Sequence, residues 1–283
     1  MTHVMACIDG SASSTAVCDF AAWASARLSA PLNLLHVIDR SLYPQKGDLS
    51  GNIGLGSREH LLEQLAALDE QRGKLALEQG QLMLSAAKER VMATGIATVA
   101  LQQRHGDLAD TLHELEADIR LLVIGKQGDT SPSAGQPMGS QLESVIRSLH
   151  RPILVTPSTF SAPQSLMLAF DASATSRKGV EMLAASPLFK GLPIHLVMVG
   201  PDVASNWQPL EHAASVLAGA GFEVHKALVQ GEVEPALHEY QASHGVDLLV
   251  MGAYGHSRIR EFLVGSTTTA MIRTSTSPLL LLR

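Results

Sequence analysis

The sequence contains one internal repeat, and a repeat of this length indicates two related folding units rather than one. Two apolar runs that each end in an aspartate, 4–9 and 166–171, begin the two halves. Two further apolar runs that each end in a glycine, 121–125 and 248–252, match each other in the same order. The chain is therefore expected to contain two copies of one fold.

The spacing of the matched positions shows where the halves differ. The two aspartates are separated by about 35 more residues than the two glycines, so the first half contains an insertion. The extra residues fall at about 40–94. Proline and hydroxyl residues at 156–163 are typical of a linker. We predict a first domain over 1–157, which holds the helical insertion, and a second domain over 163–283.

Strand and helix patterns alternate within each half. Short apolar runs are typical of parallel strands that are covered on both faces, and alternation with helices indicates βαβ units with right-handed crossovers. The sequence therefore predicts an α/β fold of two tandem, doubly wound domains, each a five-stranded parallel sheet with helices on both faces. In the second half the predicted strands are 165–170, 193–199, 222–229, 247–251 and 278–282, and the predicted helices are about 175–186, 208–219, 232–244 and 266–274.

The insertion has a helical pattern over about 58–93. Gly73 and Gly80 each weaken it as an isolated helix by about 1 kcal/mol relative to alanine. Two interpretations stay open: the helix packs along its own domain, or it binds a partner or a second copy. Five leucines at helical spacings of three, four or seven residues would form its apolar face: Leu61, Leu65, Leu68, Leu75 and Leu82.

Composition excludes several classes of protein. The net charge is −6 and the basic residues are scattered, which argues against binding nucleic acid or an anionic membrane. No apolar run approaches the ~18–20 residues of a membrane span, and the first residues do not resemble a signal peptide. Cys7 and Cys18 are spaced unlike a redox pair and are expected to be buried, inert thiols. We expect a cytoplasmic protein.

A glycine-rich loop follows the fourth strand of the second half. Gly252, Gly255 and Gly265 lead from an apolar run to Ser266 and Thr267, which open a helical pattern. Glycines allow close backbone approach, and a helix N-terminus attracts phosphate. Neither a Walker A motif nor a dinucleotide fingerprint occurs. The loop predicts a nucleotide site, although each residue taken singly could serve only as a turn or a cap.

The combined pattern resembles the ATP-binding signature of the universal stress protein family, and the resemblance covers both halves. It implies that adenine lies near Asp171 and Met198, at the ends of the first two strands. It also implies ATP as the ligand, with magnesium as a frequent companion of the phosphates. The ribose and phosphates would follow the loop at Gly252, Gly255, Gly265, Ser266 and Thr267.

The same resemblance implies an arrangement for the strands. Each sheet would have the order 3-2-1-4-5. The final strands of the two halves, 153–155 and 279–282, would pair across a pseudo-twofold axis, which makes the chain an intramolecular pseudo-dimer. Such pairing would also cover an apolar sheet edge that is otherwise exposed. A further homodimer stays open.

The first half departs from the family pattern. Its loop has ten residues rather than nine between the second and third glycines, it contains two prolines that restrict the backbone, and Gln141 replaces a hydroxyl residue. This half either binds a nucleotide or is a degenerate structural partner. Its candidate binding residues are Asp9, Val37, Gly125, Gly128, Gly139 and Ser140.

The resemblance implies a regulatory, ATP-binding stress-response protein rather than an enzyme. Two alternatives stay open: a slow ATPase or phosphotransferase that uses His256 or Asp171, and a scaffold that binds partners through 58–93 without nucleotide. No zinc-protease or hydrolase motif occurs, so no catalytic residue and no metal ligand is assigned.

Overall fold

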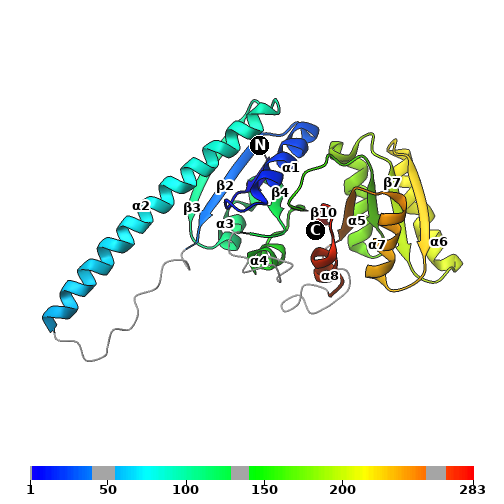
Figure 1. The fold of residues 1–283 in the computed structure, drawn as a ribbon. Coiled ribbons are helices and arrows are strands. Elements are labelled where there is room, and N and C mark those ends of the chain that lie inside the picture. The colour runs from blue at the N-terminus through cyan, green and yellow to red at the C-terminus, as the bar shows by residue number, and fades with distance from the viewer. Residues whose placement is uncertain (1, 40–54, 129–139, 253–265) are drawn as a thin grey trace.

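The computed structural model describes residues 2–39, 55–128, 140–252 and 266–283 (Figure 1). The strands of the first half are β1 (His3–Cys7), β2 (Leu32–Ile38), β3 (Val99–His105), β4 (Ile119–Gly125) and β5 (Ile153–Thr156). The strands of the second half are β6 (Leu166–Ala169), β7 (Ile194–Val199), β8 (Val224–Val229), β9 (Leu248–Gly252) and β10 (Leu279–Leu282).

The helices alternate with these strands along the chain. The helices of the first half are α1 (Ser14–Leu28), α2 (Leu55–Ala93), α3 (Leu108–Glu114) and α4 (Ser140–Ser148), with a short 3₁₀ turn at Glu116–Asp118. The helices of the second half are α5 (Ala174–Ala185), α6 (Ala204–Gly219), α7 (Val233–His244) and α8 (Ser266–Thr274), with a 3₁₀ turn at Pro187–Phe189.

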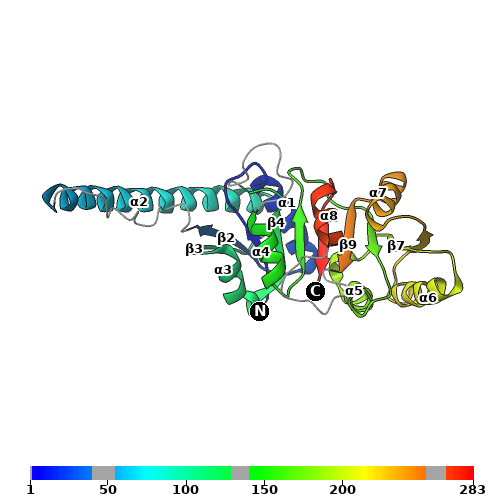
Figure 2. The same cartoon turned by 90° about the horizontal axis from the view of Figure 1, so that it is seen from below.

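All of these strands belong to one ten-stranded sheet in the order β3-β2-β1-β4-β5-β10-β9-β6-β7-β8. Within each half the order is third, second, first, fourth, fifth, and neighbouring strands are parallel. The two halves meet where β5 and β10 pair antiparallel, with Leu280 opposite Leu154. β10 therefore lies in the middle of the molecule, as Figures 1 and 2 show. This is the pairing that the resemblance to the universal stress protein family implied.

The sheet is covered on both faces, which confirms the doubly wound α/β class. Val4 and Ala6 of β1 belong to the apolar core under α1, α2, α5 and α6, whereas Met5 between them belongs to the core under α3, α4, α7 and α8. Alternate side chains of a strand point to opposite faces, so a continuous aliphatic run is required when both faces are buried. None of the described helices is long and apolar enough to cross a lipid bilayer.

Helix α6 begins earlier than its sequence pattern predicts, at Ala204 rather than at 208. The added turn is held by Trp207, whose indole Nε1 donates to Asp202 Oδ1 at 2.6 Å, and by the Asn206 amide, which donates to the Val203 carbonyl at 3.0 Å. Pro209 therefore lies inside the helix, one turn after its start.

Helix α2 contains 39 residues, and the described apolar side chains that it buries lie in its last part. Leu84, Ala87 and Val91 are buried against the sheet, and Arg90 donates to both carboxylate oxygens of Asp19 at 2.8 and 2.7 Å. The rest of α2 extends beyond the sheet (Figures 1 and 2). The expectation that the leucine face packs along its own domain is wrong for its described side chains, because these are exposed: Leu65, Leu68, Leu75 and Leu82.

Candidate functional site

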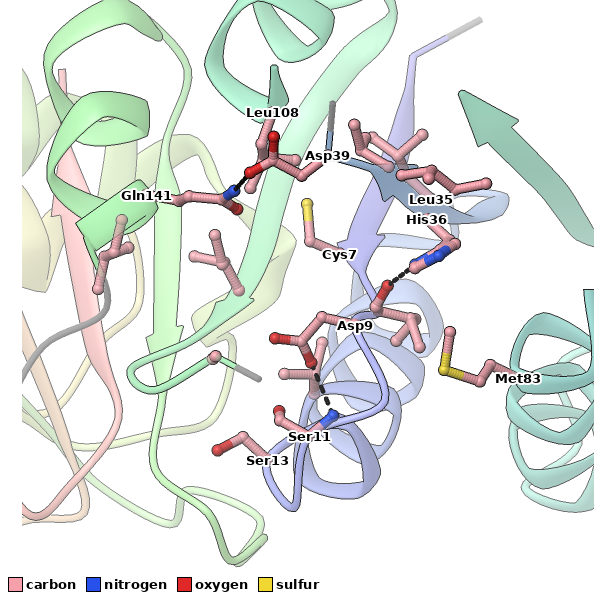
Figure 3. Close-up of a pocket in the computed structure, with 18 of the residues that line it drawn as sticks. Cys7, Asp9, Ser11, Ser13, Leu35, His36, Asp39, Met83, Leu108 and Gln141 are labelled. Atoms are coloured by element: carbon pink, nitrogen blue, oxygen red, sulfur yellow. Dashed lines mark hydrogen bonds between the residues drawn. The ribbon is translucent and has the colours of Figure 1, made fainter. Parts of the chain in front are cut away.

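A cavity of about 330 Å³ opens at the carboxyl ends of β1, β2 and β4 (Figure 3). β1 pairs with β2 on one side and with β4 on the other, so the chain leaves β1 at the point where the strand order changes direction. Doubly wound sheets bind their ligands outside such a switch point. The topology alone therefore makes this cavity the candidate site of the first half.

The structure brings four of the six predicted residues of the first half to this cavity. Asp9, Val37, Gly125 and Gly128 all line it, although they come from three different strands or the loops after them. Ser140 is the first residue of α4, and Gly139 lies outside the described residues.

Asp9 organises the turn between β1 and α1. Its Oδ1 accepts hydrogen bonds from the Ser11 amide and the Ser14 hydroxyl, both at 3.0 Å (Figure 3 draws the first). A Cβ atom added to Gly128 would lie 2.9 Å from Asp9 Oδ2. Glycine at this position therefore lets the loop after β4 come close to the carboxylate.

Gly10 follows Asp9 with a φ of +79°, a left-handed conformation that glycine adopts without strain. A Cβ atom here would overlap Met83 Sδ on α2. We expect Gly10→Ala to lower the free energy of unfolding by about 2 kcal/mol, because the strained φ and the displaced methionine both cost energy. Urea denaturation measures the change.

Two controls separate the causes of this loss. In a Met83→Ala background, Gly10→Ala should cost only the strain, about 1 kcal/mol. Gly73→Ala on α2 meets open space and should be neutral or stabilising. An equal loss with and without the Met83 side chain would show that this contact does not hold α2 at the site.

Two polar contacts join the elements around the cavity. The His36 ring nitrogen Nδ1 lies 2.7 Å from the Ile8 carbonyl, and Gln141 Nε2 donates to Asp39 Oδ2 at 2.9 Å (Figure 3). The sequence pattern identifies Gln141 only as a departure from the expected hydroxyl residue. In the structure it links the start of α4 to the residue after β2, which the spacing of the motif could not show.

Helix α2 supplies a wall of the cavity that the sequence did not predict. Arg72, Ala76, Gln79 and Met83 line it at a spacing of three or four residues, so they form one helical face. Arg72 brings a positive charge to the cavity, where a phosphate could be bound.

The lysine of the first-half loop, Lys126, is directed away from the cavity. Its Nζ donates to the carbonyls of Arg273 and Ser275 at 2.7 and 2.8 Å, at the C-terminal end of α8. Partial burial lowers the pKa of this ammonium group. Lys126 therefore ties the two halves together, since cations are stabilised at the C-terminal ends of helices.

The sequence model of the universal stress protein family matches residues 1–157 and 163–283. The chain belongs to the universal stress protein family. A universal stress protein of Synechocystis sp. is 37% identical to it over 292 residues, and the match spans 100% of each chain.

More distant relatives agree with this assignment. A universal stress protein of Mycobacterium bovis is 24% identical over 249 residues, which cover 79% of this chain and 74% of that protein. The crystal structure of a universal stress protein from Archaeoglobus fulgidus shares the fold with a TM-score of 0.71, at 18% identity over 99% of this chain and 98% of that chain. The shared fold therefore extends over nearly the whole of both chains.

The second half of this universal stress protein repeats the turn after its first strand. Asp171 Oδ1 accepts from the Ser173 amide at 3.0 Å, as Asp9 does from Ser11, and the Ser173 hydroxyl caps α5 by accepting from the Ser176 amide at 3.2 Å. Met198 is buried in β7. Gly252 ends β9, and Ser266 and Thr267 begin α8; Gly255, Gly265 and His256 lie outside the described residues.

The thiols of this universal stress protein are poorly ionised. Burial raises the pKa of the half-buried Cys7 to about 12, and the negative charge of Asp9 adds to the effect. Burial also raises the pKa of Cys18 to about 11. Within the described ranges, no group of three or more histidine, cysteine or acidic side chains could hold a metal ion.

Proposed function

We propose that this universal stress protein is a regulatory, ATP-binding protein of the stress response, and that one nucleotide binds in the cavity of its first half. The observation that carries the proposal is the convergence of Asp9, Val37, Gly125 and Gly128 on one cavity from separate places in the sequence. A volume of about 330 Å³ falls within the range of small-molecule sites.

Each part of the cavity has a role in this proposal. Adenine lies against the ends of β1 and β2, beside Val37. The ribose and phosphates follow Gly125 and Gly128 toward Gly139 and the N-terminus of α4 at Ser140, where free amide groups and the helix dipole favour negative charge. Magnesium, when present, accompanies the phosphates.

A second nucleotide is proposed for the other half, where the family loop is intact in the sequence. Asp171, Met198 and Gly252 occupy the positions there that correspond to residues of the first-half cavity. The repeated aspartate turn supports the correspondence, because Asp171 and Asp9 make the same contact to the amide two residues later. The remaining residues of this site are Gly255, Gly265, Ser266 and Thr267.

A regulatory role is favoured over catalysis by the chemistry of the first-half cavity. The Cys7 thiol is protonated at neutral pH, so it is a poor nucleophile. The Asp9 carboxylate accepts two hydrogen bonds from the turn that it caps, which orients it for structure and binding. Bound nucleotide would act by stabilising one of two states of the protein.

The number of nucleotides bound tests both sites at once. ATP and ADP, with and without magnesium, are titrated calorimetrically into the wild type, Gly128→Val, Gly265→Val and the double variant. We expect two sites in the wild type, one in each single variant and none in the double variant, because a β-branched side chain blocks the backbone from the phosphates.

Matched controls make the titration decisive. Gly73→Val lies in open space on α2 and should keep both sites. Two sites in a folded Gly128→Val variant would refute the first-half assignment. If the wild type bound no nucleotide, the alternative of a scaffold that binds partners without nucleotide would be favoured. Release of inorganic phosphate by the wild type that is lost in the double variant would make the protein an ATPase instead.

A further inference from the structure

Four ring side chains gather at the amino ends of β7 and β8, beside the last turn of α7. His195 and His225 are register partners on these neighbouring strands, and their ring centroids lie 4.9 Å apart. Tyr240 and His244 lie one turn apart on α7, and their ring centroids are 3.9 Å apart in a stacked arrangement. The centroid of the His244 ring lies 5.7 Å from that of His195. These four residues are called the histidine cluster below.

His195 lies at the centre of the histidine cluster and joins β7 to α7. It is partly buried, and its Nδ1 lies 3.0 Å from the Tyr240 hydroxyl oxygen. Burial raises the pKa of Tyr240, so the phenol stays protonated at neutral and acidic pH. In this pair the imidazole is therefore the group that gains a charge when the pH falls below neutrality.

The charges that face His195 determine how readily it accepts a proton. In acid His225 and His244 also become positively charged, and they face His195 from β8 and α7. Glu223, just before β8, has its Oε1 3.2 Å from His225 Nε2, and this single carboxylate offsets only one of the two charges. On the other side, the register partner of His195 in β6 is the uncharged Met167.

Protonation of His195 is therefore disfavoured in the folded protein. Burial lowers the pKa of His195, and the positive charges of His225 and His244 lower it further. The negative charge of Glu223 opposes this shift. In the unfolded chain an imidazole gains its proton near pH 6.5, so below this pH the unfolded chain binds more protons than the folded chain. The contribution of His195 to stability is complete above about pH 6.5 and is lost as the pH falls toward the pKa of the folded state.

We propose that the histidine cluster is an acid-sensitive latch. While its imidazoles are neutral, it holds the last turn of α7 against β7 and β8. When they take up protons, their mutual repulsion releases this turn. The latch is separate from the first-half cavity, which opens at the carboxyl ends of its strands rather than at their amino ends.

Release of α7 would extend to the contact between the two halves. Gln241 in the same turn is buried, and its Nε2 donates to the Val246 carbonyl at 3.0 Å and to the Ser277 hydroxyl at 2.7 Å. Ser277 lies between α8 and β10, where its carbonyl accepts from the Ser275 hydroxyl at 2.9 Å. The Ser275 carbonyl in turn accepts from Lys126 of the first half. A released α7 therefore no longer supports the segment that leads into β10.

The first half provides an internal control, because neutral residues replace the two strand histidines. Asn33 and Ala100 are register partners on β2 and β3, at the positions where His195 and His225 are partners on β7 and β8. The corresponding helix, α3, has 7 residues, whereas α7 has 12. The acid response should therefore occur in α7 and not in α3.

Hydrogen exchange of the full chain, measured by mass spectrometry of peptic fragments, tests the latch. Between about pH 7.5 and pH 5.5, after correction for the intrinsic exchange rate, the protection of residues 233–244 should fall about tenfold. The protection of residues 108–114 should change by less than about twofold over the same range. The comparison uses one sample at each pH, so both helices are measured in the same molecules.

Three variants identify the group that responds to acid. His195→Gln keeps a polar side chain opposite Tyr240 but gains no charge, and its loss of protection should be less than about twofold. His225→Gln/His244→Gln changes two exposed side chains, keeps His195 and should show a loss of about threefold, which tests the latch even if His195→Gln does not fold. The control is His238→Gln on the same helix, whose ring Nε2 lies 2.8 Å from Thr274 Oγ1 of α8, and it should keep the tenfold loss.

Three results would overturn the proposal. The first is a protection of α7 in the wild type that does not change with pH. The second is an equal loss in the wild type and in His195→Gln, which would place the acid-sensitive group elsewhere. The third is an equal loss in α3, which would show that acid destabilises the whole protein rather than releasing α7. These measurements are made without nucleotide, so their outcome is independent of the proposed function.

Discussion

Truncating Leu280 to alanine is expected to lower the free energy of unfolding by about 3 kcal/mol, because the side chain lies at the centre of the contact between the halves. Leu280 is 2% exposed and Leu154, its register partner across the antiparallel pair, is 1% exposed. Both belong to the same apolar core, which also contains residues of α1 and α5. Removing either side chain leaves a cavity that the paired strands cannot close.

A double-mutant cycle tests whether the loss of stability comes from the contact between β5 and β10. Leu154→Ala should cost a similar amount, and the double variant should cost less than the two together, with a coupling of about 1 kcal/mol between neighbours. Urea denaturation with a far-ultraviolet signal measures all four proteins. Val203→Ala, at an exposed apolar side chain, should change stability by no more than about 0.5 kcal/mol. Full additivity would show that the two leucines do not support each other.

The Cys7 thiol is expected to react with iodoacetamide about a thousandfold more slowly at pH 8 than an exposed thiol. The reactive species is the thiolate, and a pKa near 12, against the ordinary 9.0, leaves very little of it at this pH. Burial is the larger cause, and the neighbouring Asp9 carboxylate is the smaller. Slow access to the cavity would reduce the rate further.

The pH dependence of alkylation checks the cause. In a Cys18→Ser background the rate should rise about tenfold per pH unit from pH 7 to 10 without reaching a plateau. Asp9→Asn should increase the rate, since it removes the negative charge that opposes ionisation. Ala12→Cys in a background without Cys7 and Cys18 provides the exposed reference thiol. A plateau near pH 9 for Cys7 would contradict the raised pKa.

Much of the sheet could be predicted because its signals are local. The apolar runs of the second half predict strands within one or two residues of their observed ends, since a strand buried on both faces must be aliphatic throughout. The leucine pattern of α2 was misleading for a different reason. Periodicity shows which residues share a helical face, but the residues that meet the sheet are Leu84, Ala87 and Val91.

The residues of the candidate site also fall into two groups, those that a local motif predicts and those that only the packing of the elements brings together. Asp9 and the glycines after β4 could be found because the motif has a fixed spacing along the chain. The contact between Asp39 and Gln141, and the cavity wall that includes Arg72, join elements that are far apart in the sequence. Their proximity depends on how α2 and α4 pack on the sheet, and no local pattern encodes that packing.

The antiparallel pairing of β5 with β10 also means that the sheet cannot be completed until the last strand has been translated. β5 has no neighbour on its outer side until β10 is made, more than a hundred residues later. At about 5–20 residues per second, its edge is open for on the order of ten seconds. Open strand edges can pair with other chains, so the nascent first half passes through an aggregation-sensitive stage. Once β10 has paired, the Arg283 side chain that follows it donates to the Leu149 carbonyl at 2.7 Å and so adds a hydrogen bond to the first half.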